Sequence, residues 1–93
     1  MVVGLATCEC LIYEAHSLKD KRAVLQRILM RLKQKYNVSV SEVDYQDLWQ
    51  RTKIAIVAVS SSQVSTEKEL TNALNLIDSF PEIERTITEW EWI

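Results

Sequence analysis

Hydrophobic and polar residues follow two different periods along the chain, and the changes between them predict its elements. Residues 2–14 are rich in Val, Leu, Ile, Thr and Cys and are apolar on both faces for much of their length, which predicts a long central strand. Ser17 and Asp20 then have the spacing of a capping box, so a helix is predicted from there to about Tyr36. Its apolar stripe recurs every three or four residues, at Leu25, Ile28, Leu29, Leu32 and Tyr36.

The middle of the chain predicts two strands joined by a polar connection. Val38, Val40 and Val43 mark a short strand whose alternation is interrupted, which is typical of a sheet edge. Asp44–Gln50 is polar with two aromatic residues and forms the connection. Residues 51–60 end in an uninterrupted apolar run, which predicts a second central strand.

A second helix and a last strand complete the pattern. Thr66 and Glu69 offer another capping box, and Pro81 ends the helix that follows. Residues 83–92 predict the last strand. The apolar stripe of this helix consists of Leu70, Ala73, Leu74, Ile77 and Phe80.

The order β-α-β-β-α-β predicts an α+β, ferredoxin-like fold, in which two helices cover one face of a four-stranded antiparallel sheet. Residues 1–93 form one domain of this kind. The other sheet face lacks helices and exposes apolar groups, so we expect a homodimer or higher oligomer. On the last strand Ile83, Ile87 and Ile93 point one way and another set points the opposite way. Alternation does not decide which side is buried, because Glu89 and Glu91 share the side of Ile87 and Ile93. The predicted oligomer interface is that other set, Thr86, Thr88, Trp90 and Trp92.

Composition narrows the class of protein further. Apolar residues make up 47% of the chain and charged residues 26%, which is typical of globular proteins. The first residues lack the basic start of a signal peptide and no apolar run could span a membrane, so a cytoplasmic protein without a membrane partner is expected. Cys8 and Cys10 are interpreted as buried thiols. His16 is the single histidine and Gly4 the single glycine, so we assign no catalytic residue, metal site, cofactor or phosphate-binding loop and expect no enzymatic activity.

Charge is distributed unevenly. Residues 17–37 contain seven basic residues and one acid, whereas the rest of the chain contains four basic and twelve acidic residues. Such asymmetry favours an anionic partner, and cations along a helix could contact successive phosphates of a nucleic acid. The alternative is an amphipathic helix whose basic side chains are simply solvated. The candidate nucleic-acid-binding residues are Lys19, Lys21, Arg22, Arg27, Arg31, Lys33 and Lys35.

The connection before residue 52 is a second candidate site. Acidic, amide, aromatic and guanidinium groups are concentrated there, and such a loop could recognise a base or a partner protein. The structural alternative is that Trp49 closes the end of the core while Asp47 pairs with Arg51 or caps the turn. The candidate recognition residues are Asp44, Asp47, Trp49, Gln50 and Arg51.

Four segments closely resemble the YlxP family of small bacterial proteins of unknown function. They are Ser17–Arg22 (SLKDKR), Asn37–Asp44 (NVSVSEVD), Asp47–Arg51 (DLWQR) and Ser79–Thr88 (SFPEIERTIT), in the same order along nearly the whole chain. The resemblance implies a ferredoxin-like fold and no established reaction. It also implies a role near RNA or the ribosome, because genes of this family often lie among those for translation initiation and ribosome-assembly factors.

Together these observations favour a non-enzymatic protein that binds RNA or a ribosomal particle in translation or ribosome assembly, with no DNA partner expected. Base stacking on the sheet is not expected, because Ile54–Ala58 on the second central strand contains no ring. Two alternatives stay open: an oligomeric scaffold or protein-interaction module, and a regulatory domain that binds a small ligand at a subunit interface.

Overall fold

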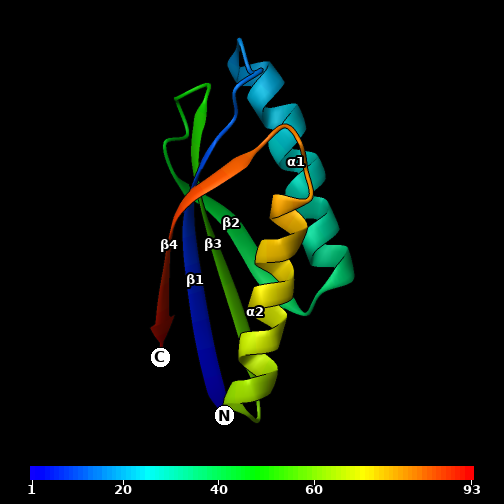
Figure 1. The fold of residues 1–93 in the computed structure, drawn as a ribbon, viewed down its shortest axis with the longest axis vertical. Coiled ribbons are helices and arrows are strands. Elements are labelled where there is room, and N and C mark those ends of the chain that lie inside the picture. The colour runs from blue at the N-terminus through cyan, green and yellow to red at the C-terminus, as the bar shows by residue number, and fades with distance from the viewer.

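The computed structural model describes all 93 residues of the chain. The strands form one antiparallel sheet in the order β2-β3-β1-β4, and both helices lie on the same side of it (Figure 1). This is the ferredoxin-like α+β arrangement that the sequence predicts. The elements are β1 (Val2–Leu11), α1 (Leu18–Lys35), β2 (Val38–Asp44), β3 (Arg51–Ser60), α2 (Gln63–Asp78) and β4 (Glu84–Trp92).

β1 and β3 are the central strands, as expected, and every second side chain on each lies under the helices. On β1 these residues are Gly4, Ala6, Cys8 and Cys10. The two thiols are buried and reduced, with 3.8 Å between their sulfur atoms, so their interpretation as buried thiols is confirmed. The pKa of Cys10 is raised, because its thiol donates a hydrogen bond to Cys8 and because burial disfavours a thiolate.

The predicted cap of α1 is confirmed. The side chain of Ser17 accepts a hydrogen bond from the backbone N–H of Asp20 at 3.0 Å, and the carboxylate of Asp20 accepts one from the backbone N–H of His16 at 3.1 Å. These two bonds satisfy N–H groups that a helix start leaves without partners. The helix then buries Leu25, Ile28 and Leu32 against the sheet.

α2 begins earlier than the capping box at Thr66 and Glu69 predicts, so that prediction is wrong. Ser62 is the N-cap, and its side chain accepts a hydrogen bond from the backbone N–H of Ser65 at 3.1 Å. Thr66 is fully buried inside the helix, where its hydroxyl lies 2.7 Å from the hydroxyl of Ser60. The serine run before the apolar stripe therefore supplies the cap and adds a turn to the helix.

The predicted oligomer interface, Thr86, Thr88, Trp90 and Trp92, does not lie on the open sheet face. Trp92 pairs with Gly4, and Trp90 pairs with Ala6, so both indoles lie on the helix side of the sheet. Thr88 pairs with Cys8 on that side too. Thr86 lies in a β-bulge, where its hydroxyl donates to the backbone oxygen of Glu9. The bulge interrupts the alternation on which the prediction depended.

The open face of the sheet has an apolar centre and a charged side. Leu5, Val57 and Val59 occupy neighbouring positions on β1 and β3, and 49% of Val59 is exposed. Glu89 and Glu91 flank this centre on β4. Self-association through this face stays a prediction, with these residues in place of the tryptophans. No helix of the chain is long and apolar enough to cross a membrane.

Candidate nucleic-acid interface

The structure exposes six of the seven predicted cations along the outer side of α1. One acid, Asp20, lies among them, and its carboxylate is engaged at the helix start. We call these six residues the basic face of α1: Lys19, Arg22, Arg27, Arg31, Lys33 and Lys35.

Lys21 does not belong to the basic face, which corrects its prediction as a phosphate contact. It is 1% exposed, and its ammonium lies 2.9 Å from a carboxylate oxygen of Glu42. The ammonium also donates to the backbone oxygen of Tyr45, while Thr52 donates to the same Glu42 oxygen at 2.6 Å. The sequence carried a signal for this burial, because Lys21 precedes Leu25 by four residues and continues the apolar stripe.

The cations of the basic face differ in the partners that they have within the protein. Arg27 forms an ion pair with Glu82, and this pairing holds the pKa of Glu82 below its usual value. Arg31 lies over the ring of Phe80, 5.7 Å from its centroid, and is in no ion pair. Lys19 and Arg22, near the start of the helix, are in no ion pair.

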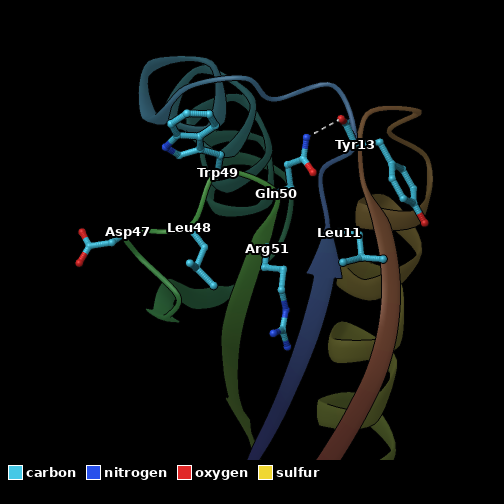
Figure 2. Close-up of a pocket in the computed structure, with 7 residues that line it drawn as sticks. All are labelled: Leu11, Tyr13, Asp47, Leu48, Trp49, Gln50 and Arg51. Atoms are coloured by element: carbon cyan, nitrogen blue, oxygen red, sulfur yellow. Dashed lines mark hydrogen bonds between the residues drawn. The ribbon is translucent and has the colours of Figure 1, made fainter.

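The β2–β3 loop (residues 45–50) has a backbone that buried and neighbouring groups hold in place. Asp44 accepts a hydrogen bond from the backbone N–H of Tyr45 at 2.7 Å, and Tyr45 has a positive φ of 62°. The side-chain amide of Gln50 donates to the backbone oxygens of Tyr13 and Ala15, both at 3.1 Å. Gln50 thereby ties the loop to the turn that follows β1, and the dashed line in Figure 2 marks its bond to Tyr13.

The structural alternative for this loop is wrong in two respects. Arg51 pairs with Glu9 at 2.8 Å and stacks over the ring of Tyr45, 4.3 Å from its centroid, instead of pairing with Asp47. Trp49 is 51% exposed, so it does not close the core. Asp47 points away from the other side chains drawn in Figure 2.

A cavity of about 630 Å³, widely open to solvent, lies beside this loop at the end of the sheet. Tyr13 and Trp49 stand on opposite sides of it in Figure 2. The hydroxyl of Tyr13 donates to Glu84 at 2.8 Å, and this bond raises the pKa of Tyr13. Besides Trp49, the predicted recognition residues Asp47, Gln50 and Arg51 line the cavity. The other three lining residues, Leu11, Tyr13 and Leu48, were not predicted from the sequence. The full lining is Leu11, Tyr13, Asp47, Leu48, Trp49, Gln50 and Arg51.

The missed residues had a weak signal in the sequence. Leu48 is an apolar residue inside an otherwise polar connection, and Tyr13 lies where the first strand was expected to continue. β1 ends at Leu11, because the chain then turns and Ile12 donates its N–H to the backbone oxygen of Gln50 at 2.9 Å. That turn places Tyr13 next to a loop far along the chain.

The basic face of α1 and the cavity lie at the same end of the molecule but on opposite sides of the sheet, because Leu11 and Arg51 of the cavity lining occupy outward positions of β1 and β3. In Figure 1 the first turn of α1 and the β2–β3 loop both lie at the upper end, away from the two termini. Lys21 connects them physically, because its Cα is in the first turns of α1 and its ammonium binds the backbone oxygen of Tyr45. Lys19 and Arg22 flank Lys21 in that part of the helix.

Comparison with known proteins agrees with the resemblance in the sequence. Residues 3–90 match a family model described as "Protein of unknown function (DUF503)". The "Uncharacterized protein YlxP" of Bacillus subtilis (strain 168) is 66% identical over 91 residues, which cover 98% of this chain and 99% of that protein. The chain belongs to this family. Neither the family description nor that of the Bacillus protein names an activity.

One solved structure is also similar. It is described as "Structure of the REP associates tyrosine transposase bound to a REP hairpin", with a TM-score of 0.47 and 10% sequence identity. The match covers 98% of this chain and 55% of that chain, so this chain spans about half the length of that protein.

Proposed function

We propose that this family member is a non-enzymatic, cytoplasmic protein that binds RNA or a ribonucleoprotein during translation or ribosome assembly. One observation carries the proposal: of the six cations on the basic face of α1, only Arg27 is in an ion pair. The remaining five are available to an anionic partner, on a protein whose formal net charge is −2.

The geometry of a helix suits contacts to a nucleic-acid backbone. An α-helix of 18 residues is about 27 Å long, so its exposed cations are spread over several phosphates of an RNA strand. Each cation that neutralises a phosphate releases condensed counterions, which favours binding and makes it depend on salt. The five unpaired cations are Lys19, Arg22, Arg31, Lys33 and Lys35.

The open sheet face is a poor surface for RNA. Ala55, Val57 and Val59 occupy the outward positions of β3, and none of them has a ring on which a base could stack. Glu89 and Glu91 on β4 would repel phosphates. The proposal therefore assigns RNA contacts to α1 and to the loop at its first turn. The part of the proposal that concerns translation rests on the gene neighbourhood that the family resemblance implies.

A salt titration tests the proposal. The purified protein is titrated with ribosomal subunits and with short structured RNAs over a series of salt concentrations. We expect affinity to fall steeply as salt rises, and Arg22→Glu with Arg31→Glu to abolish binding while the melting temperature stays nearly unchanged. The absence of binding at low salt would overturn the proposal.

The matched control moves the same charge change to other elements. Lys53 lies on β3 and Lys68 on α2, and neither is in an ion pair. The pair Lys53→Glu and Lys68→Glu changes the net charge by the same amount as the α1 pair. Equal loss of RNA binding in both pairs would show that net charge, and not the basic face of α1, governs the affinity.

A further inference from the structure

The loop beside the cavity has a rigid backbone and unpacked side chains. At its start, the ammonium of buried Lys21 donates a hydrogen bond to the backbone oxygen of Tyr45. At its end, the side-chain amide of Gln50 donates to the backbone oxygen of Ala15. Within it, the backbone N–H of Leu48 donates to the backbone oxygen of Tyr45 at 3.0 Å, which closes a turn. The apolar side chains of this loop nevertheless lie outside the core: Leu48 is 44% exposed and Trp49 is 51% exposed.

The chemistry of the cavity suits a flat aromatic ligand with polar edges. Its volume of about 630 Å³ lies within the range of about 300–1,000 Å³ that is common for small ligands. The rings of Tyr13 and Trp49 offer stacking surfaces, and the stem of Arg51 forms part of the wall. Gln50 uses only its amide nitrogen for the two backbone oxygens, so its side-chain oxygen stays free to accept a hydrogen bond.

The position of the cavity favours a base over an apolar side chain of another protein. The first turns of α1 approach the loop through Lys21, and the unpaired cations Lys19 and Arg22 belong to those turns. A strand whose phosphates contact these cations reaches the cavity by passing over this end of the sheet onto the open face. In a duplex the base faces are covered by stacking neighbours, whereas in a single strand a base can turn outward.

We infer that this cavity receives one unstacked nucleobase of a single-stranded RNA segment, which stacks on Trp49. The inference rests on the proposed RNA binding and deepens it, because it names the form of RNA that is recognised. Phosphate contacts on the basic face of α1 then supply general affinity, and the cavity selects unpaired nucleotides.

The test follows the indole of Trp49 in the unmodified protein. The chain has three tryptophans, and two-dimensional ¹H–¹⁵N NMR gives one indole N–H signal for each. The signal that disappears in Trp49→Phe identifies Trp49. Three probes of the same sequence are compared: a short single-stranded RNA, its duplex with the complementary strand, and the single strand with its central bases removed as abasic sites. We expect the single strand alone to shift the Trp49 signal, while those of Trp90 and Trp92 stay in place.

Affinity measurements complete the test. Trp49→Ala is expected to weaken binding of the single strand about 5- to 150-fold, which is the loss expected for one stacked base, and Trp49→Phe to keep most of the affinity. Met30→Ala is the matched control, because Met30 is 55% exposed on α1 and does not line the cavity. It should leave binding unchanged.

The outcomes separate this inference from the proposed function. If RNA binds through Arg22 and Arg31 while Trp49→Ala keeps full affinity, the base-binding cavity is overturned and RNA binding stands. An equal shift of the Trp49 signal with duplex and single strand also overturns it. If no probe binds at low salt, both are overturned, and a partner protein becomes the occupant to seek.

Discussion

The two helices pack on the same side of the same sheet, but their outward faces differ sharply. Both begin with a serine cap and bury an apolar stripe. α1 carries seven basic residues and one acid, whereas α2 carries one basic residue, Lys68, and three acids. Since packing makes the same demand on both helices, it does not explain the cations of α1. The difference is one that the proposed RNA binding would account for and that packing alone does not.

The comparison also separates two kinds of cation within α1. Lys21 continues the apolar stripe and is buried with Glu42, so it belongs to the structure. Arg22, the next residue, is exposed and in no ion pair. Two neighbouring residues of the same charge therefore differ in burial and in ion pairing. Substitutions can test whether they also differ in their effect on stability.

Replacing Lys21 is expected to have the largest effect on stability. Lys21→Met leaves the Glu42 carboxylate mostly buried without its cation and removes a donor from the Tyr45 carbonyl. Breaking a buried pair in this way costs about 3–5 kcal/mol, and we expect the lower end of that range because Glu42 is 17% exposed. Urea unfolding followed by circular dichroism measures the loss.

Two companion variants decide whether that loss comes from the pair. Arg22→Met, on the exposed side of the same helix turn, should change the free energy of unfolding by no more than about 0.5 kcal/mol. Adding Glu42→Met to Lys21→Met should recover much of the lost stability, since the uncompensated charge is then gone. If Lys21→Met and Arg22→Met cost equally little, the distinction between the two kinds of cation is wrong.

The second largest effect is expected where α2 approaches the sheet most closely. A Cβ atom at Gly4 would lie 2.9 Å from side-chain atoms of Leu70, Thr66 and Trp92. Gly4→Ala should therefore lower the free energy of unfolding by about 1–3 kcal/mol, because buried side chains of α2 and the indole of Trp92 must shift. Thermal unfolding checks this. Should Gly4→Ala leave the melting temperature unchanged, α2 and Trp92 would not be packed against β1 as described.

The sequence predicted the fold better than it predicted the site, and particular residues show why. Apolar stripes and Ser17 report local geometry, so the order of the elements and the first helix cap followed from them. The side on which Trp90 and Trp92 lie depends on a β-bulge opposite Glu9, and no local pattern marks it. Likewise Tyr13 joins the cavity only because the chain turns after Leu11, and that turn is fixed by Gln50, far along the chain.

The smallest effect concerns the one cation of the basic face that the protein itself neutralises. Arg27 holds the pKa of Glu82 below its unfolded value, so the pair stabilises the folded state above the unfolded pKa of about 4.3 and loses this contribution as pH falls through the folded pKa. Arg27→Gln should therefore cost at most about 1 kcal/mol at pH 7, since both groups are partly exposed, and nothing at a pH low enough to protonate Glu82 in the folded state. Urea unfolding at both pH values measures the difference, and Arg22→Gln, which breaks no pair, should show no such pH dependence. A cost of Arg27→Gln that stays constant between the two pH values would mean that Arg27 contributes through packing, and that its charge is as free for RNA as that of its neighbours.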